Sequence, residues 1–159
     1  MRNNKPLICL GSDHAGFELK EAVARHLRQA GYRISDHGAF SIEPSDYPDF
    51  IIPAAEEVVR SKGRAKGIVF GGSGIGECIA ANKVAGIRAA PVCDDYTAKM
   101  SRLHNDANVL CLGSRTVTGD PATAIKLIKT WLRTPFSKET RHVRRLGKII
   151  RYEKLGHRR

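Results

Sequence analysis

The sequence contains few cysteines, and they form no pattern. Its four cysteines, Cys9, Cys78, Cys93 and Cys111, lie far apart, with no C-x-x-C pair and no His-rich spacing beside them. Because zinc sites and disulfide frameworks depend on closely spaced Cys and His residues, neither is indicated. We expect reduced thiols in or near a core and no bound metal.

Long hydrophobic runs are also missing. The first apolar run, Leu7 to Leu10, is short, and no window approaches the roughly 20 apolar residues that a membrane span requires. A chain of 159 residues that is 42% hydrophobic suits a single domain over residues 1–159 with an adequate core. We therefore expect one cytoplasmic domain that does not enter a membrane.

Aromatic residues are scarce, at 6%, and acidic residues are outnumbered, so that the net charge is +11. The excess is concentrated in residues 137–159, which hold nine Lys/Arg and two acids. This tail lacks interleaved aromatics and any recognised nucleic-acid motif, so nucleic-acid binding is not favoured. A solvated helix face or a site for a phosphate-bearing small molecule remain the two interpretations of the tail.

Short apolar runs alternate with stretches of helical periodicity along the chain. Five strands alternating with helices predict an α/β fold with a parallel sheet covered on both faces. One proline, Pro53, is compatible with its helix only near the first turn. The expected strands are 7–10, 32–36, 67–70, 87–92 and 109–112, and the expected helices are 17–30, 50–61, 75–84, 96–104, 118–132 and one from about Ser137.

A glycine-rich loop from Gly71 to Gly76 is the most informative feature present. It follows an expected strand and opens an expected helix, where glycines let backbone N–H groups approach an anion closely. The next residue, Glu77, would repel a phosphate at close range. The loop therefore predicts a base beside a site for an oxyanion.

Two nucleotide-binding motifs fit this loop only in part. A P-loop requires Lys and Ser/Thr where the chain has Glu77 and Cys78. A dinucleotide fingerprint fits Gly72 and Gly74 but places Glu77 at the third glycine. Dinucleotide binding and a ligand-free glycine turn are therefore the weaker alternatives.

Ligands of parallel sheets bind beyond the carboxyl ends of the strands. The segments expected there are 11–16, the glycine loop, 93–95 and 113–115. A further polar segment, His104 to Asp106, lies at the far end of its helix. Whether this segment reaches the same site depends on how the whole chain folds.

Six segments, in this order, resemble the type B ribose-5-phosphate isomerases, which are grouped with the galactose-6-phosphate and allose-6-phosphate isomerases. The resemblance implies a three-layer α/β/α sandwich with a five-stranded parallel, Rossmann-like sheet. It also implies homodimers, sometimes paired into tetramers, with active sites shared between subunits and no cofactor. The matching segments are GSDHAG at 11–16, DYP at 46–48, GGSGIG at 71–76 followed by AANK at 80–83, HNDANV at 104–109, GSR at 113–115 and RHVRR at 141–145.

The resemblance assigns catalytic roles as well. Members of the family carry the base either as Cys at the position of Gly71 or as Glu at the position of Glu77, so this chain is similar to the Glu subtype. His104 corresponds to the histidine that opens the cyclic sugar, and Asp13 to an acid that assists it. An ordinary helix cap at Asp13 and a capping or buried His104 are the structural alternatives.

The remaining predicted site residues bind substrate. The loop amides of Gly72, Gly74 and Gly76, helped by Ser73, are expected to stabilise an enediolate. The resemblance also implies substrate-lining roles for His14, Tyr47 and Asn105. It implies a phosphate clamp made of Arg115, Arg141, His142 and Arg145, the last three on a basic helix at about 137–155 that is expected to reach the partner subunit. A structural role for the first three and a solvated face for the arginines are the alternatives.

The predicted function is a cofactor-free aldose–ketose isomerase that interconverts ribose 5-phosphate and ribulose 5-phosphate through an enediolate, in the pentose phosphate pathway. The alternatives are an isomerase of a tetrose, allose or galactose phosphate, or a Rossmann-like nucleotide-binding protein. The predicted partners are a small sugar phosphate and a second copy of the chain, with neither nucleic acid nor membrane.

Overall fold

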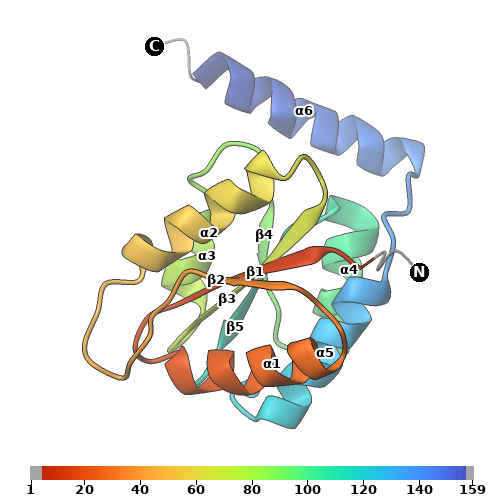
Figure 1. The fold of residues 1–159 in the computed structure, drawn as a ribbon. Coiled ribbons are helices and arrows are strands. Elements are labelled where there is room, and N and C mark those ends of the chain that lie inside the picture. The colour runs from red at the N-terminus through yellow and green to blue at the C-terminus, as the bar shows by residue number, and fades with distance from the viewer. Residues whose placement is uncertain (1–4, 157–159) are drawn as a thin grey trace.

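The computed structural model describes residues 5–156, so the outer ends of the predicted domain, residues 1–4 and 157–159, lie outside the described residues. A five-stranded parallel sheet forms the centre of the molecule (Figure 1). Its strands are β1 (Leu7–Ser12), β2 (Ile34–Asp36), β3 (Ala65–Gly71), β4 (Ala89–Pro91) and β5 (Val109–Gly113).

The order of the strands across the sheet is β2-β1-β3-β5-β4. It differs from the 2-1-3-4-5 order of flavodoxin-like sheets by an exchange of the last two strands. β3 and β5 are therefore neighbours, with Gly71 paired to Gly113 at their carboxyl ends. As a result, the segments that follow these two strands lie side by side.

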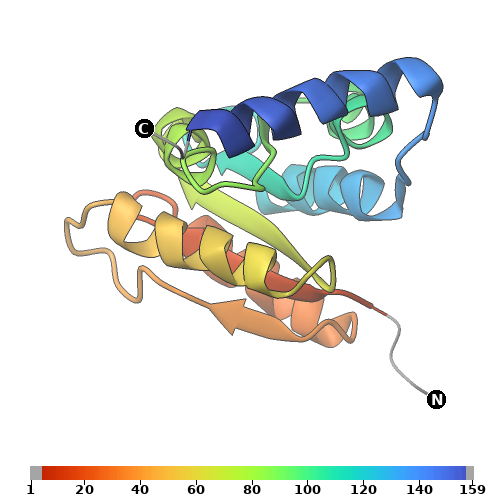
Figure 2. The ribbon, with the colours of Figure 1, turned by 90° about the horizontal axis from the view of Figure 1, so that it is seen from above.

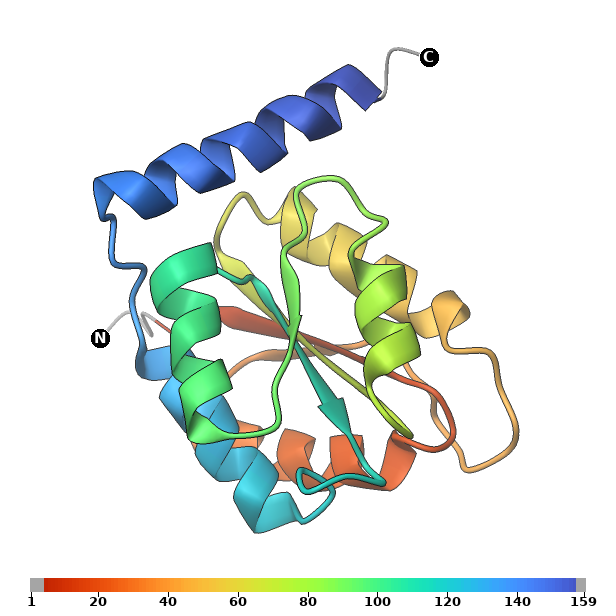
Figure 3. The same ribbon diagram turned by 180° about the vertical axis from the view of Figure 1, so that it is seen from behind.

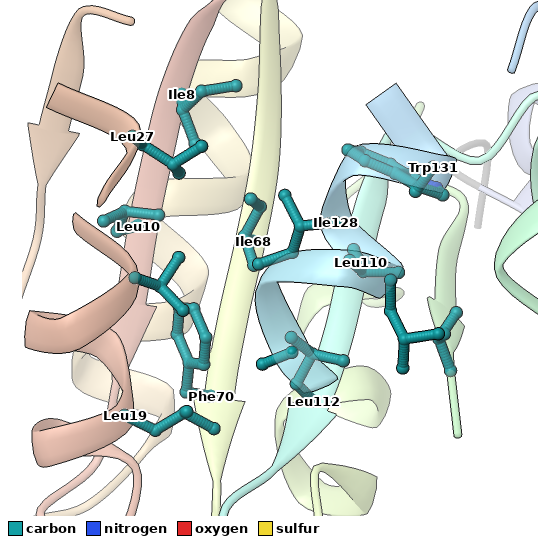
Figure 4. Close-up of a cluster of buried hydrophobic side chains, with 14 of the residues drawn as sticks. Ile8, Leu10, Leu19, Leu27, Ile68, Phe70, Leu110, Leu112, Ile128 and Trp131 are labelled. Carbon is teal, nitrogen blue, oxygen red and sulfur yellow. The ribbon is translucent and has the colours of Figure 1, made fainter. Parts of the chain in front are cut away.

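Helices cover both faces of the sheet, as the alternating strand and helix pattern predicted. Residues that alternate along each strand point to opposite faces, so Ile68 and Phe70 pack in one hydrophobic cluster and Val69 in the other. The first cluster includes side chains of α1 (Phe17–Gln29), α4 (Asp95–Asn105) and α5 (Pro121–Arg133), and Figure 4 shows α1 and α5 residues against the strands. The second includes α2 (Pro48–Arg60) and α3 (Ile75–Ala81).

The basic helix α6 (Thr140–Gly156) belongs to neither layer. It crosses the molecule beyond the amino ends of the strands and contacts α4 there (Figures 2 and 3). Only His142 and Leu146 of this helix are buried. No helix among residues 5–156 is long and apolar enough to cross a membrane.

The observed elements differ from the predicted ones mainly at their ends. α2 begins at Pro48, two residues before the predicted start, because proline is favoured in the first turn. Pro53 consequently lies inside the helix, so its predicted restriction to the first turn is wrong. β4 is shorter than predicted and covers only Ala89–Pro91, and α6 begins at Thr140 rather than near Ser137.

A fully buried lysine, Lys20, joins α1 to β2. Its Nζ lies 2.6 Å from Asp36 Oδ2 and 2.9 Å from Glu21 Oε1. We expect Asp36→Asn to lower the free energy of unfolding by about 3 kcal/mol, because it leaves a buried charge without its closest partner. Glu21→Gln, which alters the more exposed partner, should cost about 1 kcal/mol or less. Urea denaturation measures both, and a loss in Asp36→Asn no larger than in Glu21→Gln would contradict this account.

Candidate active site

A cavity of about 270 Å³ lies at the carboxyl edge of the sheet. It collects side chains and loop backbone from segments that follow three different strands, β1, β3 and β5, together with the start of α2. The lining residues are Asp13, His14, Ala15, Tyr47, Gly72, Ser73, Gly76, Glu77 and Arg115. Most of the predicted site is therefore assembled at this edge.

The glycine loop is anchored to the segment after β5. Ser114 N–H donates to the carbonyl of Gly71 at 2.8 Å, and Arg115 N–H donates to that of Gly72 at 2.9 Å. Gly74 caps α3 with φ of 78°, and a Cβ there would come within 2.9 Å of the Leu112 backbone. Gly74 thus packs against β5 and is not among the lining residues, in contrast to Gly72, Gly76 and Ser73.

The carboxyl group of Glu77 is packed against the first glycine of the loop. Glu77 is 3% exposed, and a Cβ built on Gly71 would lie 1.9 Å from its Oε1. Burial raises the pKa of Glu77, and the nearby charge of Asp13 raises that pKa further. A carboxylate with a raised pKa is suited to accept and return a proton near neutral pH.

Asp13 and His14 are fixed by the loop that follows β1. Asp13 Oδ1 accepts a hydrogen bond from Gly16 N–H at 3.0 Å, so this carboxylate holds the turn before α1 and also lines the cavity. The His14 N–H donates to Ser45 Oγ at 3.1 Å, and Ser45 N–H donates to His14 Nδ1 at 3.2 Å. The N-cap of α1 is Gly16, without a side-chain cap hydrogen bond, so the alternative that Asp13 is an ordinary helix cap is wrong: Asp13 holds the preceding turn and lines the cavity.

Tyr47 closes one side of the cavity. It is the residue before α2, and its ring lies over Gly76, where a Cβ would come within 3.0 Å of Tyr47 Cζ. The close approach of the ring requires the small residue at position 76. Arg115, which is exposed, lines the cavity beside Gly72 and supplies its positive charge.

The other predicted residues form a second group at the opposite edge of the sheet. His104 lies in the last turn of α4, near the start of β5, and its ring stacks on that of His142 with centroids 4.3 Å apart. His142 is 2% exposed, and burial together with the charges of His104 and Arg141 lowers its pKa. Arg141 is exposed and pairs with Glu139 at 2.8 Å.

Two arginines hold the segment that carries His104 and Asn105. Arg88 Nε donates to the carbonyl of Asn105 at 2.9 Å, and its Nη2 lies 3.2 Å from Asp106 Oδ2. Arg102 Nη1 pairs with Asp106 Oδ1 at 2.7 Å. Asp106 has a positive φ of 44°, so these contacts stabilise a backbone conformation that Asp adopts less readily than Gly.

Within one chain the structure does not bring the two groups together. The glycine loop follows the carboxyl end of β3, whereas His104 precedes the amino end of β5, and all five strands are parallel. His104, Asn105, Arg141, His142 and Arg145 are therefore absent from the cavity that Glu77 lines.

Comparison with known proteins identifies the family. The model of the ribose/galactose isomerase family matches residues 8–149. The chain belongs to the ribose/galactose isomerase family. It is similar to ribose-5-phosphate isomerase B of Mycolicibacterium paratuberculosis, with 45% identity over 148 residues that cover 92% of this chain and 91% of the relative.

Two solved structures of isomerases are similar to this chain in their three-dimensional fold. Ribose-5-phosphate isomerase B of Clostridium thermocellum superposes with a TM-score of 0.88 and 46% identity, covering 93% of this chain and 97% of that one. The Mycoplasma genitalium enzyme with bound ribulose 5-phosphate gives a TM-score of 0.87 and 42% identity, over 93% and 96% of the two chains. The predicted α/β fold with a five-stranded parallel sheet is confirmed.

Several residues that shape this isomerase-family site were not among those predicted. Ala15 lines the cavity, and Ser45 positions His14. Arg88 and Asp106 fix the backbone beside His104. Asp106 belongs to one of the six segments that carry the family resemblance, but Arg88 stands in no such segment, and only the folded chain shows its contacts.

Proposed function

We propose that this chain interconverts ribose 5-phosphate and ribulose 5-phosphate without a cofactor. The observation that carries the proposal is the buried carboxylate of Glu77, with its raised pKa, on the wall of a cavity that also contains glycine-loop backbone and Arg115. An aldose–ketose isomerisation requires a base at adjacent carbons and a site for a developing oxyanion. The relatives named as ribose-5-phosphate isomerases support the pentose substrate.

Glu77 acts as the base in the proposed mechanism. It removes the proton from the carbon next to the carbonyl; the electron pair of that C–H bond forms a C=C bond while the π pair of the C=O bond moves to the carbonyl oxygen, which gives an enediolate. The loop backbone at Gly72 and Gly76, with Ser73, stabilises the negative charge. Glu77 then returns the proton to the neighbouring carbon, while the hydroxyl proton of the enediolate passes from one of its two oxygens to the other and the new C=O bond forms. The carboxylate is thereby regenerated, and no external acid or base is consumed.

Asp13 and His104 prepare the substrate in this mechanism. Pentose phosphates are largely cyclic, whereas the enediolate forms only from the open chain. His104 moves the proton to or from the ring oxygen, a task suited to an imidazole near neutral pH, and Asp13 assists. Arg115, Arg141 and Arg145 bind the phosphate, since guanidinium groups match its geometry.

We propose that each active site is built from two chains. The cavity with Glu77 comes from one subunit, while His104, Asn105, Arg141, His142 and Arg145 come from the second group of its partner. The separation of the two groups at opposite edges of one sheet supports this arrangement, as does the mostly exposed helix α6. A homodimer is the smallest assembly that completes both sites, and a dimer of dimers would contain the same shared sites.

Mixing two inactive variants tests the shared site. Glu77→Gln and His104→Asn subunits should each be nearly inactive alone. In a mixed dimer one site carries both changes and the other carries neither, so an equal mixture should recover about a quarter of wild-type activity.

A matched mixture provides the control for this experiment. Glu77→Gln and Asp13→Asn both alter the group at the carboxyl edge, so every site of their mixed dimer keeps one defect and no recovery is expected. If Glu77→Gln and His104→Asn also show no recovery, although subunit exchange is verified with a tag on one variant, each chain builds its own site.

The substrate is tested with a panel of four-, five- and six-carbon aldose phosphates. We expect ribose 5-phosphate to give the highest kcat/KM, and a higher value for allose or galactose 6-phosphate would assign the chain to the hexose branch of its family. Equilibrium dialysis with NAD(P) and ATP should show no tight binding. Tight nucleotide binding without isomerase activity would refute the proposal.

We also propose a cytoplasmic location for this chain. All four cysteines are free thiols, which is consistent with that location.

A further inference from the structure

A second cavity, of about 390 Å³, lies at the amino edge of the sheet, opposite the cavity that Glu77 lines. Residues at or just before the amino ends of β3, β4 and β5 meet there with the last turn of α2. The residues of this amino-edge cavity that carry the argument are Val58, Val59, Lys66, Arg88, Asp106 and Asn108. The proposed mechanism uses none of them, and the volume lies in the range of small-molecule sites.

The ammonium group of Lys66 has no counter-charge in the amino-edge cavity. Among residues 5–156 it makes no hydrogen bond or ion pair, and its Nζ lies 5.6 Å from the centroid of the Trp131 ring. Burial and the charge of Arg102 lower the pKa of Lys66 to about 8, an effect that Asp106 opposes and Arg88 reinforces. An anion in the cavity would therefore stabilise the charged form of Lys66.

The carboxylate that lines the cavity is already paired with two arginines. Asp106 Oδ1 lies 2.7 Å from Arg102 Nη1, and its Oδ2 lies 3.2 Å from Arg88 Nη2. Another carboxylate nearby, Glu153 of α6, accepts a hydrogen bond from the backbone N–H of a lining glycine at 3.2 Å and does not itself line the cavity. Lys66, Arg88 and Arg102 thus outnumber the carboxylate on the wall, and the local charge is positive.

Other polar groups of the wall are paired within the fold. The carbonyls of Val58 and Val59 accept hydrogen bonds at 2.7 and 3.1 Å. The Asn108 side chain accepts from Arg88 N–H at 2.7 Å and donates to the carbonyl of Gly86 at 2.9 Å. These contacts hold the wall in place and give Lys66 no acceptor, while the two valines make one side of the cavity aliphatic.

We propose that the amino-edge cavity binds a small phosphate monoester and that its occupation lowers turnover. The phosphate dianion lies between Lys66 and Arg88, the types of side chain that bind phosphate in proteins, and the carbon skeleton lies against Val58 and Val59. The effect on turnover rests on the proposed function, whereas binding does not.

Arg88 connects this cavity to the proposed catalytic residues. Its Nε donates to the carbonyl of Asn105 at 2.9 Å, and its Nη2 donates to that of Asp106 at 2.9 Å. Hydrogen bonds from guanidinium to phosphate are stronger than those to neutral carbonyls, so a bound phosphate draws Arg88 away from the segment that carries His104. We expect kcat to fall about threefold or more, because small displacements of a catalytic group have large effects on rate.

Isothermal titration calorimetry with glycerol 3-phosphate measures binding. This monoester has no carbonyl group, so the isomerisation cannot consume it. The titrations use an Arg115→Ala background, in which the cavity of Glu77 has lost its positive charge, and constant ionic strength. We expect Lys66→Met to weaken binding about tenfold or more, because a charge-assisted hydrogen bond is lost.

Lys99→Met is the matched control for the titration. It removes an exposed lysine of α4 that does not line the cavity, so affinity should change by less than about twofold. Circular dichroism checks that each variant folds, and Lys66→Gln takes the place of Lys66→Met if that variant does not fold.

Inhibition kinetics without the Arg115 substitution separate the two cavities. Glycerol 3-phosphate bound beside Glu77 competes with ribose 5-phosphate and raises the apparent KM, whereas in the amino-edge cavity it lowers the apparent kcat. Lys66→Met should keep the effect on KM and lose the effect on kcat, with an uninhibited kcat within about twofold of the wild type.

Three results would each overturn the proposal. They are equal affinity of Lys66→Met and its parent for glycerol 3-phosphate, equal affinity of the parent for inorganic phosphate and for the monoester, and an unchanged kcat at saturating monoester. Calorimetry requires no turnover, so a chain without isomerase activity would still show whether the cavity binds the monoester.

Discussion

Glu77→Gln is expected to lower kcat by about 10²-fold or more, with little change in KM. Glutamine has nearly the same shape, so the packing of this side chain against Gly71 is retained, but an amide cannot accept the proton of the substrate. Steady-state kinetics on ribose 5-phosphate measure the effect. Glu56→Gln, which alters an exposed carboxylate of α2, is the matched control and should change kcat by less than twofold. Near-normal turnover in Glu77→Gln would refute its assignment as the base.

The raised pKa of Glu77 adds a pH dependence to this comparison. The acid limb of kcat/KM should lie above the usual range of a carboxyl group, because Glu77 must be ionised to act, and the limb should be absent from the residual activity of Glu77→Gln.

The raised pKa of Glu77 also makes the stability of the fold depend on pH. The direction of this dependence is opposite to that caused by a salt-bridged carboxylate, whose pKa is lowered. The pKa is higher in the folded than in the unfolded chain, so the folded state is favoured fully below the unfolded pKa, and this stabilisation is lost as pH rises through the folded pKa. The stability of Glu77→Gln minus that of the wild type should therefore be larger at neutral pH than at acid pH. Thermal unfolding at the two pH values measures the difference.

The carboxyl-edge half of the site could be predicted from the sequence because it depends on a general property of parallel sheets. Segments that follow buried strands collect at one edge, which brought Asp13, the glycine loop and Arg115 together without knowledge of the strand order. The order itself was not predictable, because β4 and β5 both have the apolar character of strands and nothing local decides which of them pairs with β3. Their exchange is what places Gly113–Arg115 directly beside the loop.

The group of proposed site residues that contains His104 and His142 could be predicted only in part from local sequence patterns. His104 lies in the last turn of a helix, and helices between parallel strands run back to the amino edge, so this residue must lie away from Glu77 in its own chain. Its stacking on His142 depends on how α6 crosses the fold. Only two residues of α6 are buried, so the hydrophobic pattern of this helix does not predict how it packs. The site that we propose to be shared by two copies would leave no pattern in the sequence of one.

Gly71→Ala is expected to lower kcat by about 10²-fold through a purely steric effect. The three heavy atoms nearest to an added Cβ all belong to the Glu77 carboxyl group, at 1.9, 2.0 and 2.3 Å. The side chain of Glu77 must therefore leave its position, although the backbone at residue 71 does not have the positive φ that would itself restrict the site to glycine. A side chain at position 71 and the observed carboxylate at position 77 exclude each other.

Gly72→Ala is the matched control for this substitution. A Cβ at this neighbouring glycine would meet its closest neighbours, on Arg115, at an ordinary 3.6 Å, so kcat should change by no more than a few-fold. Equal losses in the two variants would show that the loop tolerates no side chain and that Gly71 has no special relation to Glu77.

A double variant separates the steric effect from a general disturbance of the loop. In a Glu77→Ala background the carboxyl group that an added methyl would meet is gone, so Gly71→Ala should cause no further loss of activity. The two substitutions should therefore be strongly non-additive, as expected for side chains in direct contact. If Gly71→Ala lowers the residual activity of Glu77→Ala by the same factor as it lowers that of the wild type, the methyl group acts on the loop backbone, and the space at Gly71 does not serve to hold the base.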